Sequence, residues 1–198
     1  MDKPFSQSCV ENREPILAVL LSRLAECRRL LEIGSGTGQH AVYFAPELPH
    51  IFWQTSDKQE NHDAIRAWLA DSGASNIGRP ISLDVLQDPW PSPGFHAVFS
   101  ANTAHIMPLD AVEAMFRGVG SVLNPGGQCL LYGPFNYDGR FTSDSNERFD
   151  GWLKQQNPAM GIRDLGVLAA FASEAGMYLQ EDIEMPVNNR TLIWGKER

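Results

Sequence analysis

The chain has 198 residues, of which 43% are hydrophobic, and a formal net charge of −8 at pH 7. That length suits a single domain with a substantial core, so we expect one domain over residues 1–198. The acidic balance argues against broad nucleic-acid binding. No apolar run approaches the roughly 18 residues of a membrane helix, and the N-terminus lacks a secretory pattern. We therefore expect a cytoplasmic protein with no membrane partner.

Cysteine and histidine spacing predicts no metal site. The three cysteines, at positions 9, 27 and 129, are widely spaced, which favours reduced thiols over a disulfide frame or a zinc site. Four histidines lack metal-ligand spacing and are interpreted as surface or capping residues: His40, His50, His62 and His96.

Apolar periodicity alternates between helical and strand spacing along the chain. In chain order, we expect helices around 17–24, 41–48, 64–69, 112–119 and 168–175, and strands around 30–33, 51–57, 81–85, 97–100, 129–132, 178–184 and 191–194. This repeated alternation predicts an α/β fold with a doubly wound, mainly parallel seven-stranded sheet and an antiparallel strand near the C-terminus. Ligands of such sheets bind outside the carboxyl ends of the strands.

The turn after the first strand is the most informative segment. Gly34, Gly36 and Gly38 follow an apolar run and the acidic residue Glu32. Glycines let a ligand approach the main chain closely, and the amides at a helix start offer hydrogen-bond donors. Dinucleotide-binding proteins usually carry G-x-G-x-x-G at this point, whereas this chain has G-x-G-x-G. The turn therefore predicts a cofactor site and argues against a nicotinamide cofactor.

Acidic residues end the second and third predicted strands. Asp57 lies roughly 20 residues beyond the glycines, where a carboxylate can accept hydrogen bonds from ribose hydroxyls. It could also cap the following helix. Asp84 ends the third strand, a place where a solvated aspartate is ordinary.

The glycine turn resembles motif I of class I S-adenosylmethionine-dependent methyltransferases, and the turn over 124–127 resembles their Pro-Gly-Gly turn. Almost the whole chain is similar to a methyltransferase-like family that includes methyltransferase-like protein twenty-six. The motifs that carry this resemblance are N-R-E-P-I (12–16), N-T-A-H-I (102–106), G-P-F-N (133–136), T-S-D-S-N (142–146) followed by F-D (149–150), G-I-R-D (161–164) and M-P-V-N-N (185–189).

The resemblance implies a methyltransferase that takes S-adenosylmethionine and releases S-adenosylhomocysteine. It assigns the adenine amino group to Asp84 and places Asn102 below the methionine portion of the cofactor. The expected cofactor residues are Glu32, Gly34, Ser35, Gly36, Thr37, Gly38, Asp57, Lys58, Asp84, Val85 and Asn102. The chain has neither the Asn/Asp-Pro-Pro-Tyr motif of many amino-group methyltransferases nor the cysteine motif of RNA methylation. Both of these reaction subclasses are therefore less favoured. The expected acceptor is a small molecule or another compact molecule.

Polar and aromatic residues that follow strand ends predict an acceptor wall. Its expected members are Arg13, Phe135, Asn136, Asn146, Asp150, Arg163, Asn188 and Asn189. The wall includes a loop over 142–150 and a turn at 188–189. His105 is the candidate general base, because imidazole titrates near neutral pH, although it could instead satisfy nearby backbone groups. Structural roles also stay open for Asn146 as a helix cap, for Arg163 with Asp164 as a surface pair, and for Asn188 with Asn189 as a turn.

Two other functions remain alternatives. The chain could be a non-catalytic protein that binds S-adenosylmethionine or, against the glycine spacing, a nicotinamide-dependent oxidoreductase. The absence of an obvious base does not weaken the methyltransferase hypothesis. In-line placement of the reactants contributes on the order of 7–11 kcal/mol, against roughly 3–5 kcal/mol for a base.

Overall fold

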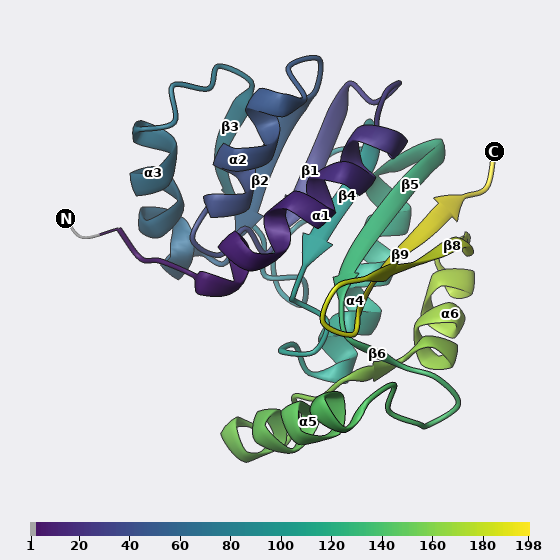
Figure 1. Cartoon of the computed structure of the whole chain (residues 1–198). Helices are drawn as coiled ribbons and strands as arrows, with labels where there is room; N and C mark the ends of the chain where they lie inside the picture. Colours follow the sequence, from purple (N-terminus) through teal and green to yellow (C-terminus); the bar gives the residue numbers. More distant parts are fainter. Residues whose placement is uncertain (1–2) are drawn as a thin grey trace.

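The structure is a computed structural model that describes residues 3–198. Its main sheet has seven strands in the order β3-β2-β1-β4-β5-β9-β8 (Figure 1). Pairing is parallel from β3 to β5, and β9 runs antiparallel to both neighbours. The expected doubly wound sheet with an antiparallel strand near the C-terminus is therefore confirmed. The strands are β1 (Arg29–Ile33), β2 (Phe52–Asp57), β3 (Ile77–Ser82), β4 (Phe95–Ala101), β5 (Leu123–Gly133), β8 (Met177–Met185) and β9 (Asn189–Lys196).

Helices cover both faces of this sheet because its central strands are apolar on both sides. Leu30 packs toward α1 (Gln7–Arg23) and α2 (Gln39–Glu47), whereas Leu31 packs toward α4 (Leu109–Val122) and α6 (Leu165–Glu174). The short helix η1 (Gln59–Asn61) leads into α3 (His62–Ala70), which lies beside α2. Among residues 3–198, no helix has both the length and the apolar character needed to cross a membrane.

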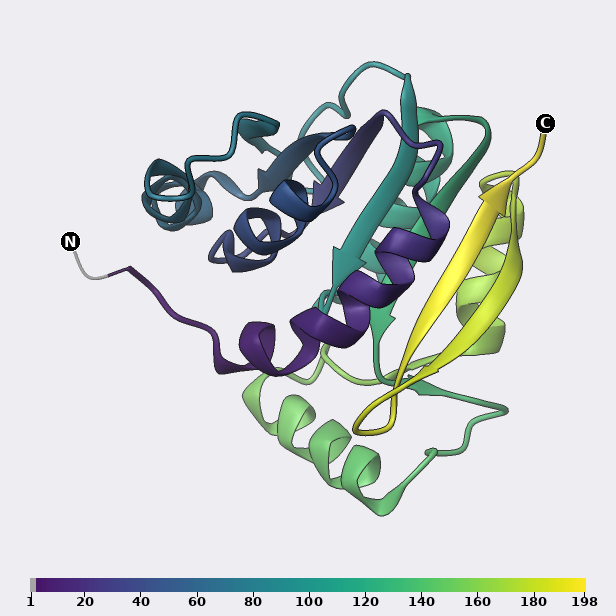
Figure 2. The ribbon, with the colours of Figure 1, turned by 45° about the horizontal axis from the view of Figure 1, so that its top comes forward.

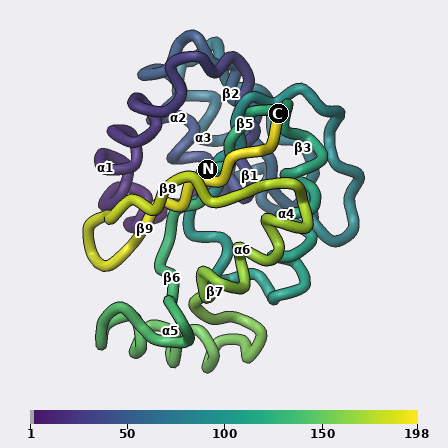
Figure 3. Tube along the Cα trace, turned by 90° about the vertical axis from the view of Figure 1, so that its right-hand side faces the viewer, coloured from purple at the N-terminus to yellow at the C-terminus, as the bar shows by residue number. Residues whose placement is uncertain are grey.

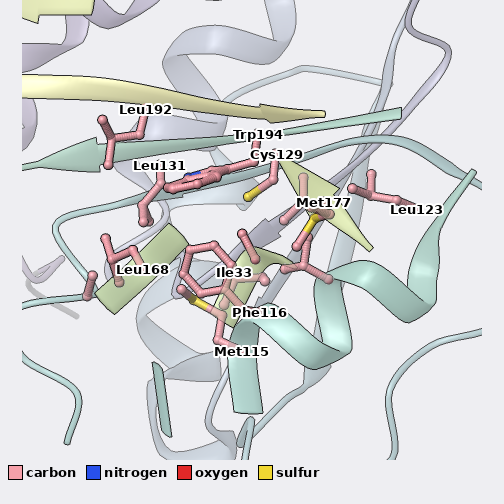
Figure 4. Close-up of a cluster of buried hydrophobic side chains, with 14 of the residues drawn as sticks. Ile33, Met115, Phe116, Leu123, Cys129, Leu131, Leu168, Met177, Leu192 and Trp194 are labelled. Atoms are coloured by element: carbon pink, nitrogen blue, oxygen red, sulfur yellow. The ribbon is translucent and has the colours of Figure 1, made fainter. Parts of the chain in front are cut away.

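Buried apolar side chains fill the core between the sheet and the pair α4 and α6, and Phe116 and Trp194 are among the largest (Figure 4). Phe116 on α4 meets Trp194 on β9 edge to face, with 5.4 Å between ring centroids. Both side chains are almost fully buried. Burial of an apolar side chain of this size contributes roughly 1.5–3 kcal/mol. The last strand is thereby fixed against α4 and closes the core.

Strand β3 differs from the sequence-based expectation. A strand was expected at 81–85, but β3 begins at Ile77 and ends at Ser82. The sequence pattern did not predict the first part of β3 because Gly78 and Pro80 lie in it, and both residue types are rare in strands. Proline is tolerated here because β3 lies at the sheet edge, where the register against β2 also shifts. Asp84 consequently lies in the loop after β3.

The chain leaves the main sheet between β5 and α6. This excursion contains β6 (Phe135–Asn136), α5 (Asp144–Gln156) and β7 (Arg163–Asp164), and β6 pairs in parallel with β7. Figure 3 shows α5 set apart from the main sheet, with β6 and β7 between them. The expected loop over 142–150 is wrong, since most of it belongs to α5. Few apolar residues mark this helix, which buries only Asn146, Asp150 and Leu153.

Candidate functional site

A cavity of about 850 Å³ opens at the carboxyl ends of β1, β2, β3 and β4. Each of these strands contributes the loop that follows it, so the cavity lies where a doubly wound sheet binds its ligand. The N-terminal segment completes the wall. Nine of the eleven expected cofactor residues line this cavity: Gly34, Ser35, Gly36, Thr37, Asp57, Lys58, Asp84, Val85 and Asn102.

The three glycines of the turn meet different demands, although all have positive φ. A Cβ on Gly34 would lie 2.6 Å from the side chain of Thr103. A Cβ on Gly36 would meet nothing within 4 Å, so this residue presents its main chain to the cavity. Gly38 precedes α2, and a Cβ there would lie 3.1 Å from the Cα of Ile65. Gly38 therefore serves helix packing and does not line the cavity.

Glu32 lies behind the turn. The Ser35 hydroxyl and the Trp53 indole N–H donate to its Oε2 at 2.8 and 3.0 Å. Burial raises the pKa of Glu32 to about 7, although the two hydrogen bonds oppose the shift. The carboxyl group of Glu32 thus holds the Ser35 side chain by a hydrogen bond and does not itself line the cavity.

Asp57 joins the end of β2 to the glycine turn. Its Oδ2 accepts from the Gly36 amide at 2.7 Å, and its Oδ1 accepts from the Lys58 amide at 2.7 Å and from the Asn61 side chain at 2.8 Å. The N-cap positions of η1 and α3 belong to Lys58 and Asn61, so Asp57 does not cap the following helix. A carboxylate accepts about four hydrogen bonds, which leaves Asp57 capacity for a ligand hydroxyl.

The loop after β3 carries the second acid of the cavity. The Lys58 ammonium lies 3.4 Å from Oδ2 of Asp84, and the Leu86 amide donates to Oδ1 of Asp84 at 3.0 Å. Asp88 accepts from the amide of Asp84 at 2.8 Å. These contacts hold the carboxylate of Asp84 and the adjacent Val85 at the cavity.

The loop after β4 forms the opposite wall. Asn102 has a φ of +58°, and its amide donates to the carbonyl of Tyr132 at 2.9 Å. The amides of Ile106 and Met107 both donate to the carbonyl of Thr103, which closes a tight turn. Ile106 and Met107 add apolar surface to the cavity.

His105 belongs to this loop but does not line the cavity. Its ring is buried edge-on against Phe149 of α5, with 5.4 Å between ring centroids. Burial, followed by the charge of Arg163, lowers the pKa of His105 to about 4. The imidazole is therefore neutral at physiological pH and lies on the α5 side of the loop.

The expected acceptor residues lie outside the cavity wall formed by residues 3–198. Arg13 stacks on Tyr43, with its guanidinium carbon 4.4 Å from the ring centroid. Phe135 is a core residue, and Asn136 is buried with its Oδ1 unpartnered. Asp150 accepts from the amide of Ile162, and Arg163 donates to the carbonyl of Ala104 in the loop after β4. The sequence alone could not distinguish these structural roles from binding of an acceptor, because the partners of these residues are distant in the chain.

Three of the four asparagines expected at the acceptor wall lie at the junction of α5 and the turn between β8 and β9. Asn146 donates from its side chain to the carbonyl of Asn188 at 3.2 Å, and Asn188 donates to the Ser145 hydroxyl at 3.2 Å. Asn189 donates to the carbonyl of Pro186 within the turn. The N-cap of α5 is Ser143, so Asn146 does not cap this helix.

Sequence reasoning missed the N-terminal part of the cavity. Pro4, Ser6, Ser8 and Cys9 line it, and Figure 2 shows this segment running past α3 toward the start of α1. The Trp68 indole donates to the carbonyl of Pro4 at 2.7 Å. No local pattern announces such a contact, because 64 residues separate the two partners.

Two histidines differ from their interpretation as surface or capping residues. His62 is buried, and its ring nitrogen bonds to the carbonyl of Asp57. His40 is buried but borders the cavity, with Nε2 2.8 Å from Oδ1 of Asn12. Burial lowers the pKa of His40 to about 4. Within residues 3–198, no group of three or more His, Cys, Asp or Glu side chains is placed to hold a metal ion.

The sheet order and the cavity at its carboxyl edge define a Rossmann-like fold that solved methyltransferases share. The chain is similar to the mitomycin 7-O-methyltransferase MmcR, with a TM-score of 0.83, 15% identity, and coverage of 96% of this chain and 54% of that one. For human N-acetylserotonin methyltransferase in complex with SAM, the TM-score is 0.80 at 16% identity, with coverage of 97% and 53%. For an O-methyltransferase family protein from Burkholderia thailandensis, the TM-score is 0.81 at 15% identity, with coverage of 93% of this chain and 56% of that one.

These similarities show the fold, and the chain spans about half the length of the solved structures it matches. A family model described as "Protein of unknown function (DUF938)" matches residues 3–196. Because this match covers nearly the whole sequence, the chain belongs to that family.

Proposed function

We propose that this chain is an S-adenosylmethionine-dependent methyltransferase that acts on a small molecule or another compact acceptor. One observation carries the proposal. The G-x-G-x-G turn, the acid that ends β2 and the acid in the loop after β3 line one cavity at the carboxyl edge of the sheet. The narrower kinship with methyltransferase-like protein twenty-six belongs to this proposal and rests on the sequence motifs alone.

The chemistry of the cavity fits S-adenosylmethionine. The open main chain at Gly36 leaves room for the amino-acid end of the cofactor. Asp57 has a free acceptor position for a ribose hydroxyl. Asp84 and Val85 would hold adenine, with Lys58 holding Asp84, and Asn102 would lie below the methionine portion. In this proposal Thr37 joins the wall near Gly36, while Glu32 and Gly38 support the turn from behind.

When bound, the cofactor supplies an activated methyl group on a sulfonium. The residues of this chain bind the cofactor, orient it and shield it from water. Placing an acceptor in line with the methyl group is worth on the order of 7–11 kcal/mol, so orientation alone supplies a large part of the acceleration. Neutral His105 stays a proposed proton acceptor, although its ring must move toward the cavity to act.

We place the acceptor beside α5 and the turn between β8 and β9. Asn146 and Asn188 already join these two elements at the carboxyl edge. Once an acceptor is found, His105→Ala should lower turnover while cofactor affinity changes only a few-fold, and Asn146→Ala or Asn189→Ala should raise KM for the acceptor. Wild-type turnover and KM in all three variants would move the acceptor elsewhere.

Calorimetry with S-adenosylmethionine, S-adenosylhomocysteine, NAD and NADP tests the cofactor. We expect the first two to bind and NADP to fail, because Asp57 would repel a ribose phosphate. Binding of NADP that displaces S-adenosylhomocysteine would support the oxidoreductase instead. Binding of S-adenosylmethionine without methyl transfer to any member of a broad acceptor panel would support the non-catalytic binding protein.

A further inference from the structure

A set of hydrogen bonds ties the loop after β4 to the segment that follows α5. The Arg163 guanidinium donates to the carbonyls of Ala104 at 2.9 Å, of Met107, and of Ala159 at 2.8 Å. The amide of Gly161 donates to the carbonyl of His105 at 2.9 Å. Three carbonyls of one short loop are therefore held from the segment 161–163.

Helix α5 in turn fixes that segment. Asp150 is buried on α5, and its Oδ1 accepts from the amide of Ile162 at 2.8 Å. Its Oδ2 pairs with the Lys154 ammonium at 2.6 Å. Gly161 has a φ of +155°, and a Cβ there would lie 2.9 Å from Oδ1 of Asp150. The motifs N-T-A-H-I, F-D and G-I-R-D thus meet in one network.

The other side of the same loop faces the cavity. Asn102, Thr103, Ile106 and Met107 line it, whereas Arg163 approaches the loop from behind and does not line it. A guanidinium offers donors in a rigid planar fork, so one side chain can hold two carbonyls at a fixed separation. A lysine ammonium lacks this geometry. Arg163 therefore has the chemistry of a brace.

We propose that Arg163 is a positioning residue for the cofactor cavity. It sets the shape of the loop over 102–108, and α5 holds Arg163 in place through Asp150. This inference rests on the proposed function, because it takes S-adenosylhomocysteine as the ligand of the cavity. It gives Arg163 a role other than contact with the acceptor.

Arg163→Gln and Arg163→Lys test the brace, with Arg190→Gln as the matched control. Arg190 is also a partly buried arginine, but it bonds to Asp182 at 2.7 Å in the β8–β9 hairpin. The readouts are the Kd for S-adenosylhomocysteine and hydrogen exchange at the amides of Ile106 and Met107. We expect Arg163→Gln to weaken binding by about tenfold or more, because it loses the charge-assisted hydrogen bonds to the loop. Arg163→Lys should weaken binding by about fivefold, because an ammonium keeps the charge but cannot hold both carbonyls at a fixed separation. Both amides should exchange faster, while Arg190→Gln leaves Kd and exchange unchanged.

Asp150→Ala supplies a second, independent test. If α5 acts through Arg163, Asp150→Ala should weaken binding, and adding it to Arg163→Gln should cost less than the product of the two single effects. Wild-type affinity and wild-type exchange in Arg163→Lys would overturn the inference. It would also be overturned if the losses of affinity in Asp150→Ala and Arg163→Gln multiplied in the double variant. If the wild-type protein fails to bind S-adenosylhomocysteine, the proposed function fails, and exchange at Ile106 and Met107 still decides whether Arg163 holds the loop.

Discussion

Gly36 combines a positive φ of +58° with open space beyond its Cα. Gly73, at the end of α3, has the same combination, with a φ of +63° and nothing within 4 Å of a Cβ, but it lies outside the cavity wall. A side chain at either residue would therefore strain the backbone to a similar degree. Only at Gly36 would that side chain enter the cavity.

We predict that Gly36→Val abolishes binding of S-adenosylmethionine while the domain stays folded. Gly73→Val is the control, because both changes force a β-branched residue into the left-handed region at a cost of about 1–2 kcal/mol. Calorimetry measures binding, and urea unfolding compares the two losses of stability. Micromolar binding in folded Gly36→Val would show that the turn does not cradle the ligand.

The sequence located the residues of the cavity better than it explained those expected at the acceptor wall. Gly36 and Asp57 could be located because Gly36 lies in the turn after β1, where the glycine pattern is a local signal, and Asp57 ends β2. Arg163 has the opposite character, since it bonds to a carbonyl 59 residues away. A long-range main-chain partner leaves no trace in local spacing, so Arg163 was placed at an acceptor wall.

At the scale of elements, apolar periodicity determined how well each segment could be predicted. Helix α4 buries eight residues at helical spacing, and its existence was evident. Helix α5 buries only three residues, because it belongs to the excursion after β5 and presents most of its surface outward. Strand β3 was displaced in the prediction for another reason, since Pro80 is acceptable only at the sheet edge that β3 occupies.

The N-terminal segment is an element held to the cavity by side chains. Gln39 at the start of α2 is buried, accepts from the amide of Ser6 and donates to its carbonyl, and also accepts from the Thr37 hydroxyl. A single glutamine thus couples the segment over 3–6 to the glycine turn.

We predict that Gln39→Ala weakens binding of S-adenosylhomocysteine several-fold and lowers stability by about 1–3 kcal/mol, because partners of a buried amide lose their hydrogen bonds. Gln128→Ala is the control, since that side chain makes one exposed hydrogen bond, to the carbonyl of Arg23. Calorimetry and urea unfolding are the measurements. Equal affinity in Gln39→Ala and wild type would show that the N-terminal segment does not contribute to the ligand site.

At the scale of the whole molecule, buried titratable groups set how stability depends on pH. His40 and His105 have pKa values lowered to about 4 from 6.5 by burial, so the unfolded chain binds more protons between these limits. The free energy of unfolding therefore falls as pH falls from 6.5 to 4. Glu32 acts in the opposite direction, because burial raises its pKa from 4.5 to about 7. Its contribution to the free energy of unfolding is therefore lost as pH rises from 4.5 to 7.

We predict that acidification from pH 7 to 4.5 destabilises the protein, because two histidines outweigh one glutamate. Each buried histidine contributes up to on the order of 3 kcal/mol over its full titration. Urea unfolding at both pH values should show a smaller loss in His105→Gln than in wild type. His96→Gln is the control, since His96 is exposed. An undiminished loss in His105→Gln would remove this histidine from the acid response.

Both outer strands of the seven-stranded sheet discourage further pairing. On β3, Pro80 lacks the main-chain N–H that a new strand would need. On β8, the carboxylates Glu181, Asp182 and Glu184 pair with Arg23 and Arg190 on a strand that would face its own copy in an edge-to-edge association. With a net charge of −8, such an association would bring like charges together. The sheet is therefore self-limiting, and concentrated solutions of the folded protein should resist β-type aggregation.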